Sequence, residues 1–336
     1  MPDLAIAAPE PQASAPEPIP GLIPAGIAGI GAAVPDRVVG TAEIGERVGV
    51  DEDWIVSRTG VRNRHVIGPG ESLVELAGVA AAEALAAGGV EAAALDTILF
   101  ATFTPDALQP HSAPDLAARL GGSGATAIDV GAACSGFVAA LAIAAGQIES
   151  GRARTVLVVG ADAMSRILDH DDAKTAGLFG DGAGAAVVTA GGPGSIGPVV
   201  QGSDASGVQA LTASNTERLL RMDGRPTFRA AVATLERTTR EAAALRGLDL
   251  DEIDLFVYHQ ANARILAAVG ERLALPAERI VDCIGSYGNT SAASIPIALT
   301  QAAAANRLRP GSKVLLGAFG AGFTWATTVL DWEGSA

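Results

Sequence analysis

The sequence predicts an α/β protein that consists of two similar halves. Residues 131–159 align without a gap with residues 289–317, and small residues, apolar helix positions, a basic turn and a β-like run coincide. The same offset of 158 residues (289 minus 131) aligns residues 96–100 with residues 254–258. Because the repeated unit holds both strands and helices, it predicts two α/β halves packed face to face and not a solenoid.

The order of elements supports this prediction. Hydrophobic patterns and breaker residues predict strands at 26–31, 97–104 and 155–160, and helices at 71–88 and 113–120. The glycine-rich run 180–184 leads into a β-like run, so we expect a tight turn of the sheet and not a phosphate loop. We place the two halves at residues 21–195 and 196–336.

The composition of the chain limits its possible partners and its cellular setting. The chain has 336 residues, 49% of them hydrophobic, and a net charge of −14, which argues against nucleic acid and anionic membranes as partners. Two cysteines make no disulfide framework and fit a reducing, cytoplasmic setting, and no paired Cys/His spacing predicts a metal. The first twenty residues hold six prolines and no Lys or Arg, which predicts a disordered tail and no signal peptide. The uncharged stretch 130–148 predicts a helix buried in protein and not in lipid.

One strand–turn–helix segment carries a candidate nucleophile. Cys134 follows the apolar run 127–130 and precedes an Ala-rich helix, so it stands at a helix N-terminus, where the partial positive charge favours a thiolate. A buried structural cysteine is the alternative for this stretch alone. The repeat puts Asn289 on the equivalent turn of the second half, and His259 ends a strand there. Ligands bind at the carboxyl ends of strands in α/β sheets, so these three residues are expected to converge.

The three side chains suit acyl transfer between thioesters. A thiolate attacks a thioester and forms a new one, while a neutral imidazole and an amide donate hydrogen bonds to a developing enolate. The turn at 320–322 can offer backbone N–H groups as an oxyanion hole, or serve only as a close backbone approach.

Six motifs make a resemblance specific; they lie at residues 53–60, 132–136, 179–184, 259–262, 288–294 and 320–325. On these motifs the chain, from about residue 22 to residue 332, resembles β-ketoacyl-acyl carrier protein synthase III, one of the thiolase-fold condensing enzymes. The resemblance implies a thiolase-like fold, with two α/β halves related by pseudo-twofold symmetry in α-β-α-β-α layers.

The resemblance also implies roles. Cys134 takes an acyl group from a coenzyme A thioester, and His259 and Asn289 promote decarboxylation of a malonyl-acyl carrier protein, whose enolate attacks the acyl-enzyme. The N–H groups of Cys134 and Ala321 form the oxyanion hole. The implied coenzyme A and substrate positions are Trp54, Arg58, Thr59, Arg166, Phe179, Met222, Phe228 and Asn262. The implied carrier-protein patch is Arg229, Arg264 and Arg272. Coenzyme A enters as substrate, no cofactor is required, and a homodimer is expected.

The chain departs from the family pattern at three places, of which the first bears on affinity for the carrier protein and the other two leave the primer open. Glu271 replaces a common lysine beside the carrier patch, Gln109 stands where a dimer-mate residue closes the acyl pocket, and the segment 203–221 is short. Acetyl, branched and specialised polyketide primers stay open. An acyltransferase that passes the acyl group to a hydroxyl or amine is the main alternative. A degradative thiolase would need a cysteine after Asn289, and the intact Cys134, His259 and Asn289 argue against a non-catalytic partner subunit. A Cys-His-Asn hydrolase is disfavoured because nothing in the sequence resembles a peptide cleft.

Overall fold

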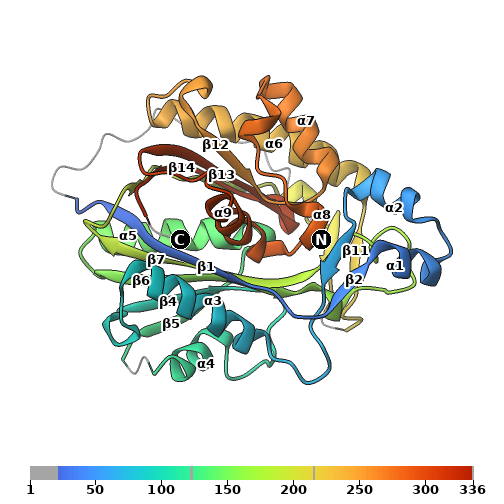
Figure 1. Ribbon diagram of the computed structural model, residues 1–336, viewed down its shortest axis with the longest axis horizontal. Helices are drawn as coiled ribbons and strands as arrows, with labels where there is room; N and C mark the ends of the chain where they lie inside the picture. Colours follow the sequence, from blue (N-terminus) through green and yellow to red (C-terminus); the bar gives the residue numbers. More distant parts are fainter. Residues whose placement is uncertain (1–21, 122–123, 215, 335–336) are drawn as a thin grey trace, which may run out of the picture.

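Five layers alternate between helices and sheets in the computed structural model, which describes residues 22–121, 124–214 and 216–334 (Figure 1). The predicted tail therefore lies outside the described residues. The outer helices are α3 (Leu73–Gly88) and α4 (Ser112–Arg119) on one side and α6 (Gly224–Leu245) and α7 (Ala263–Leu273) on the other. Helices α5 (Gly136–Glu149) and α9 (Ser294–Ala304) lie between the sheets. The predicted α-β-α-β-α layering is confirmed.

The two sheets share one pattern. The first has the order β1 (Ala25–Ala33), β7 (Asp181–Ala190), β6 (Thr155–Ala163), β4 (Thr97–Ala101), β5 (Thr126–Val130). The second has the order β12 (Leu255–Tyr258), β13 (Ser312–Gly320), β14 (Thr324–Trp332), β8 (Ser195–Ile196), with β9 (Val200–Ser203) also on β14. Strand β4 is parallel to β6, which is antiparallel to β7, and β12, β13 and β14 repeat this. The Thr97–Val156 and Leu255–Val314 pairs keep the offset of 158 residues.

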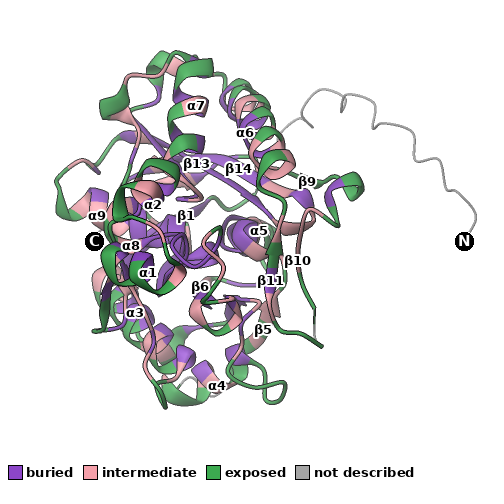
Figure 2. Ribbon diagram, turned by 90° about the vertical axis from the view of Figure 1, so that its right-hand side faces the viewer, coloured by how far each residue is buried: buried purple, intermediate pink, exposed green. Residues whose placement is uncertain are grey.

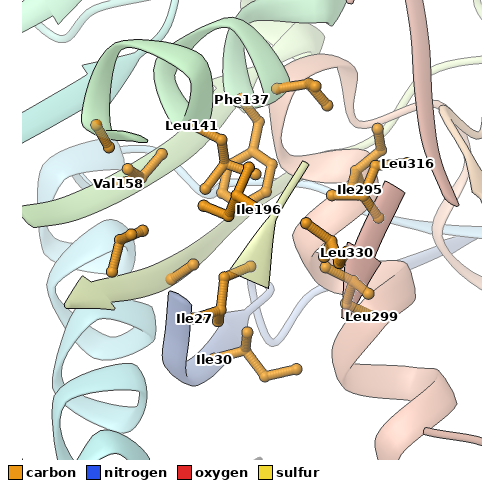
Figure 3. Packing of buried hydrophobic residues seen from close by; sticks show 14 of the residues in the cluster. Ile27, Ile30, Phe137, Leu141, Val158, Ile196, Ile295, Leu299, Leu316 and Leu330 are labelled. Atoms are coloured by element: carbon orange, nitrogen blue, oxygen red, sulfur yellow. The ribbon is translucent and has the colours of Figure 1, made fainter. Parts of the chain in front are cut away.

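The main core fills the space between the sheets (Figure 3). Phe137 and Leu141 of α5 and Ile295 and Leu299 of α9 are almost fully buried there. A helix that is apolar on all sides needs such surroundings, and burial of each large side chain contributes about 1.5–3 kcal/mol. The outer helices α4, α6 and α7 instead expose one face (Figure 2). Among the described residues, no helix is long and apolar enough to cross a membrane.

The glycine-rich run 180–184 is not a turn, so that prediction is wrong. Strand β7 begins at Asp181 and runs through it. A Cβ added to Gly184 would lie 2.6 Å from Cβ of Pro296, and one on Gly182 would lie 2.8 Å from Cδ1 of Ile297. These glycines let helix α9 pack directly on the strand.

A cap of short elements covers one end of the layers. It comprises β2 (Val38–Gly40), α1 (Thr41–Val48), α2 (Glu52–Thr59), β3 (Asn63–His65), β10 (Leu211–Ala213), β11 (Leu220–Met222) and α8 (Ile284–Tyr287). Arg64 is almost fully buried, and its guanidinium donates to the carbonyl of Val39 (3.2 Å), the hydroxyl of Thr41 (2.9 Å) and the carbonyl of Gly177 (2.8 Å). Burial lowers the pKa of this guanidinium to about 10. Arg64 thus ties the cap to the loop that follows β6.

Candidate active site

Two equivalent turns face each other between the sheets. A 3-10 turn (Ala133–Ser135) precedes α5, and a second one (Ser291–Ala293) precedes α9. Ala133 has φ 45° and Ser291 has φ 51°, the left-handed region that residues other than glycine seldom adopt. The two positions are 158 residues apart, so both halves keep the same strained corner. Such strain persists only where surrounding structure holds it, and it is common at functional sites.

The structure brings the three predicted catalytic residues into one cavity. Cys134, His259 and Asn289 all line a cavity of about 1380 Å³. Cys134 comes from the first half, and the other two come from the second half. The cavity extends from this centre to a mouth between the cap and helices α6 and α7.

His259 is fixed by the backbone that follows β12. Its N–H donates to the carbonyl of Gly317 at 2.8 Å, and the next N–H, of Gln260, donates to the hydroxyl of Ser294 at 2.6 Å. Nδ1 of the imidazole is buried and has no hydrogen-bond partner among the described residues. Burial lowers the pKa of His259 to about 3, so the imidazole is neutral at neutral pH. A neutral imidazole carries one N–H donor and one acceptor nitrogen.

Asn289 is held on both sides of its amide. Its Oδ1 accepts from the N–H of Ser291 at 2.9 Å, and its Nδ2 donates to the carbonyl of Ala261 at 3.3 Å. The backbone of Asn289 donates to Leu178 and accepts from Gly180, which fixes it beside Phe179. An amide nitrogen has two hydrogens, so one remains for a ligand in the cavity.

Cys134 differs from the sequence expectation of a thiolate. Burial raises the pKa of its thiol to about 11, with Asp162 adding to the rise and a hydrogen bond from Ser291 opposing it. The desolvation of a buried thiolate outweighs the helix terminus, so the resting thiol is protonated. Sequence patterns did not identify Asp162 or Ser291, because nothing in the spacing shows that they meet Cys134.

Of the two residues predicted to form the oxyanion hole, Cys134 lines the cavity and Ala321 does not. Gly320 lines the cavity, and a Cβ added there would lie only 2.9 Å from the backbone nitrogen of Cys134. Glycine at this position therefore lets the two backbones approach closely, because any side chain would crowd the N–H of Cys134. Ala321 follows Gly320 directly but is not among the residues that line the cavity.

Most of the predicted coenzyme A and substrate positions line the same cavity. Trp54, Arg58, Thr59, Phe179, Met222, Phe228 and Asn262 all line it. The Arg58 guanidinium lies 4.1 Å from the centre of the Trp54 ring, and Nδ2 of Asn262 donates to the carbonyl of Arg58 at 2.9 Å. The sequence analysis did not identify three cationic residues that, in the described part of the chain, also line the cavity: Lys174, Arg221 and Arg225. Lys174 lies in a charged loop after a strand, a signal that could have indicated it.

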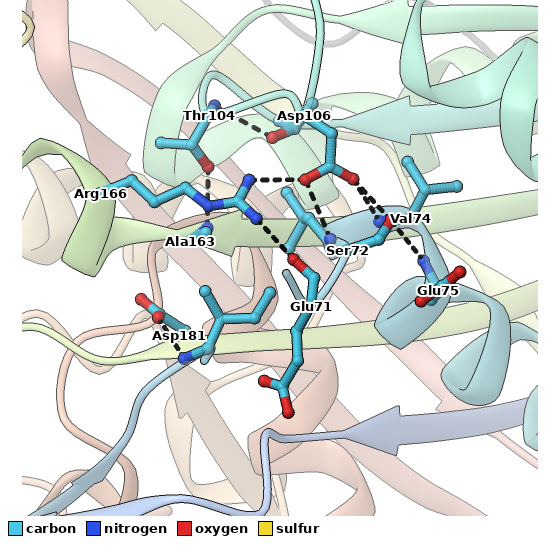
Figure 4. Close-up of polar contacts among 12 residues, drawn as sticks. Glu71, Ser72, Val74, Glu75, Thr104, Asp106, Ala163, Arg166 and Asp181 are labelled. Atoms are coloured by element: carbon cyan, nitrogen blue, oxygen red, sulfur yellow. Dashed lines mark hydrogen bonds and ion pairs between the residues drawn. The ribbon is translucent and has the colours of Figure 1, made fainter. Parts of the chain in front are cut away.

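Arg166 lies elsewhere, which corrects its assignment to the coenzyme A tunnel (Figure 4). Its guanidinium donates to a carboxylate oxygen of Asp106 at 2.6 Å and to the carbonyl of Glu71 at 3.0 Å. Asp106 in turn accepts the N–H groups of Leu73 and Val74 at the start of α3. Arg166 therefore joins the loop after β6 to an outer helix, and it does not line the cavity.

The three arginines of the predicted carrier patch are not equivalent. Arg229 and Arg264 line the cavity mouth, and Arg264 lies 5.8 Å from the centre of the Phe228 ring. Arg272 lies one residue before the end of α7 and pairs with Glu236 of α6 at 3.1 Å. The exposed charge of Arg272 is therefore partly neutralised.

Known proteins resemble this chain in sequence and in fold. The family models described as 3-oxoacyl-[acyl-carrier-protein (ACP)] synthase III and as its C terminal match residues 128–205 and 243–332. The β-ketoacyl-[acyl-carrier-protein] synthase III 2 of Streptomyces coelicolor is 43% identical over 312 residues, which cover 92% of this chain and 94% of that protein. The chain belongs to the β-ketoacyl-acyl carrier protein synthase III family.

Solved structures of synthases III agree with this membership. The enzyme of Aquifex aeolicus has a TM-score of 0.89 at 38% identity, over 92% of this chain and 100% of that one. The priming β-ketosynthase of the R1128 polyketide pathway has a TM-score of 0.90 at 35% identity, over 95% and 99%. The predicted thiolase-like fold is thus confirmed, and the cavity described above is the candidate active site of a synthase III.

Proposed function

We propose that this synthase III moves an acyl group from acyl-coenzyme A to Cys134 and joins it to a malonyl-acyl carrier protein. The product is a 3-oxoacyl-acyl carrier protein. The observation that carries the proposal is one cavity that holds a cysteine, a neutral imidazole and a partly free amide. The names of its relatives, which include a β-ketoacyl-[acyl-carrier-protein] synthase III 2 and a priming β-ketosynthase of a polyketide pathway, support the same reaction class.

In the first half-reaction the sulfur of Cys134 attacks the thioester carbonyl. The carbonyl oxygen gains negative charge, which the backbone N–H of Cys134, beside Gly320, stabilises. The carbon–sulfur bond of the donor then breaks and coenzyme A leaves as a thiolate. An acyl group remains on Cys134 as a thioester.

The second half-reaction uses the side-chain hydrogen-bond donors His259 and Asn289, which the second half of the chain contributes. Loss of carbon dioxide from a malonyl thioester leaves an enolate, and the N–H groups of His259 and Asn289 stabilise its oxygen. Removal of one such donor typically costs about 2.7–4 kcal/mol of transition-state stabilisation. The enolate carbon then attacks the acyl carbonyl and releases the sulfur of Cys134.

The mouth suits a polyanionic donor even though the chain as a whole is acidic. In the part of the chain that the structure describes, six cationic residues line the cavity: Arg58, Lys174, Arg221, Arg225, Arg229 and Arg264. Three acidic residues of the same part line it: Asp169, Asp172 and Asp223. This local excess of positive charge contrasts with the net charge of −14 and favours the phosphates of coenzyme A and of the carrier's prosthetic arm.

A homodimer is part of the proposal. Strand β5 forms an edge of the first sheet, and Ile128 in it is 43% exposed. An exposed apolar edge strand is a template for pairing, and a twofold axis would pair β5 with its copy. Leu108 is 76% exposed beside Gln109, the residue expected to reach the partner's acyl pocket. Light scattering of the purified chain measures the dimer directly.

Intact-protein mass after incubation with a panel of acyl-coenzyme A thioesters tests the proposal. Wild type and Cys283→Ala should gain the acyl mass, and Cys134→Ala should gain none. Addition of malonyl-acyl carrier protein should then release carbon dioxide and a 3-oxoacyl carrier. Acyl mass on Cys134→Ala would refute the assignment of the nucleophile, and transfer to an alcohol or amine without carbon dioxide would favour the acyltransferase. The panel also measures the primer preference.

A further inference from the structure

A serine hydroxyl contacts the nucleophile and has no part in the mechanism above. Oγ of Ser291 donates a hydrogen bond to Sγ of Cys134 at 3.4 Å. Both residues are buried, and they belong to the facing turns of the two halves. Among the described residues this is the one side-chain hydrogen bond to that sulfur. The hydroxyl therefore touches a reacting atom directly.

The backbone on both sides of Ser291 fixes the direction of this hydroxyl. The N–H of Ser291 donates to Oδ1 of Asn289 at 2.9 Å. The next N–H, of Ala292, donates to Oδ2 of Asp162 at 3.2 Å. Ser291 itself has φ 51°, in the left-handed region. A hydroxyl on a turn held in this way is preorganised toward the sulfur, which is the property that makes a hydrogen-bond donor effective in catalysis.

The equivalent corner of the first half has no hydroxyl. The offset of 158 residues makes Ala133 the counterpart of Ser291, and Ala133 adopts nearly the same backbone, with φ 45°. The strained corner is therefore compatible with alanine, and the fold does not require a hydroxyl at residue 291. What the hydroxyl adds is its hydrogen bond to the sulfur of Cys134.

A buried sulfur needs a donor whenever it carries negative charge. Burial raises the pKa of the Cys134 thiol to about 11, because a desolvated thiolate is unstable, and the hydrogen bond from Ser291 acts in the opposite direction. In the mechanism above, the N–H of Cys134 serves the carbonyl oxygen, and His259 and Asn289 serve the enolate. None of these donors is assigned to the sulfur.

We propose that Ser291 is a further catalytic residue, whose hydroxyl stabilises the sulfur of Cys134 by a hydrogen bond whenever that sulfur is a thiolate. The largest effect falls in condensation. There the enolate carbon bonds to the acyl carbon, the carbon–sulfur bond breaks, and its electron pair stays on the sulfur. The hydroxyl keeps its own proton throughout. The thiol loses its proton to solvent before acylation and regains one from solvent after condensation.

The same hydrogen bond affects attack by the sulfur less than expulsion of the sulfur. Its removal should raise the pKa of the thiol by about one unit, so the fraction of thiolate at neutral pH falls about tenfold. A more basic thiolate is also a better nucleophile, by about threefold per unit, which recovers part of the loss. Attack should therefore slow only about threefold, while expulsion should slow about tenfold.

Two reactions of Cys134 that need no carrier protein test this role, each followed by intact mass in a Cys283→Ala background. Alkylation by iodoacetamide requires the thiolate but builds no charge on a carbonyl oxygen, and it should slow about threefold in Ser291→Ala. Discharge of acyl-Cys134 by hydroxylamine requires expulsion of the sulfur, and it should slow about tenfold. Ser291→Gly, which suits a positive φ and also lacks the hydroxyl, should give the same two losses.

Ser135→Ala is the matched control. Ser135 is also a buried serine, and it is the residue next to Cys134. Its hydroxyl bonds to the carbonyl of Ala132 and to the hydroxyl of Thr324, and not to the sulfur. Both rates of this control should stay close to those of wild type.

Three results would overturn the proposal. Wild-type rates in Ser291→Ala are expected if the hydroxyl serves only the neighbouring carboxylate of Asp162. Wild-type rates in Ser291→Gly alone would assign the loss to backbone strain, and equal losses in Ser135→Ala would assign it to a general disturbance of the site. The inference rests on the proposed role of Cys134 as nucleophile. If acyl-coenzyme A leaves no acyl mass on Cys134, the proposed function fails, and alkylation alone still decides whether Ser291 acts on the sulfur.

Discussion

The turn that carries Cys134 and the equivalent turn of the second half have similar backbones but differ in the residue that faces their equivalent N–H groups. At the second turn the N–H of Ala292 is bonded by Asp162, a residue of β6. An offset of 158 residues makes Cys134 the equivalent of Ala292, and Gly320 the equivalent of Asp162. Where the second turn meets a carboxylate, the first turn therefore meets a glycine, whose added Cβ would lie 2.9 Å from the nitrogen of Cys134.

This difference shows how one duplicated unit gives two functions. The second turn, whose Ala292 N–H is bonded by Asp162, supports Asn289 and Ser291, and we propose that at the first turn the N–H of Cys134 beside Gly320 stabilises a developing oxyanion. We therefore expect the first turn to control acylation and the second turn to control condensation. The following predictions test this division, from the largest expected effect to the smallest.

Gly320→Ala places a methyl group against the first turn. The backbone of Gly320 (φ −142°, ψ −178°) is extended, so its φ and ψ suit alanine, but the added Cβ would lie 2.9 Å from the nitrogen of Cys134 and the first turn must shift. The added methyl group should block the N–H of Cys134 and slow acylation about 100- to 1000-fold, as measured by single-turnover intact mass. Gly131→Ala is the matched control, since a Cβ there meets nothing within 4 Å, and it should acylate normally. An unchanged acylation rate in Gly320→Ala would contradict the claim that the first turn controls acylation.

Asn289→Ala removes a donor of the second turn. Acylation should continue, because Cys134 and its N–H are intact, while condensation should fall about 100-fold or more through loss of one enolate donor. The two rates are measured separately, by acyl mass and by release of carbon dioxide. Equal loss of both would show that the two turns do not divide the reaction.

Arg264→Glu alters the cavity mouth and not the turns. Exposed charges contribute about 0–1 kcal/mol each and are screened by salt, so KM for malonyl-acyl carrier protein should rise up to about fivefold, and less at high salt. Acylation from acyl-coenzyme A should change less, because the carrier is not needed in that step. Arg272→Glu should have a smaller effect because Arg272 already pairs with Glu236, and Glu271→Lys should lower KM. Unaltered carrier kinetics at low salt would point to a different second substrate.

The smallest expected effect is that of pH on the rate of the second half-reaction. The pKa of His259 is lowered from 6.5 to about 3, so its imidazole stays neutral as the pH falls and becomes charged only near pH 3. Decarboxylation measured after acylation should therefore vary little between about pH 8 and pH 5. A fall centred near the ordinary histidine pKa would show that His259 is solvated in the working enzyme.

Much of the architecture followed from the sequence because it depends on local pattern. Hydrophobic periodicity and the repeat predicted two α/β halves, the buried helices and the meeting of Cys134 with Asn289 and His259. The same reasoning failed at Gly182 and Gly184, whose role is to admit Pro296 and Ile297 from a distant helix. The family resemblance failed at Arg166, which the structure pairs with Asp106 and not with the cavity.

The sequence by itself determined the duplicated α/β plan and singled out Cys134, His259 and Asn289 as the candidate catalytic residues, since repeats and motif order are properties of the chain. Only the tertiary structure decided the charge state of the site. Burial lowers the pKa of His259 and raises that of Cys134, and desolvation depends on all the atoms packed around a group and not on its neighbours in sequence. The hydrogen bond from Ser291 to Cys134 likewise exists only because the two halves pack face to face.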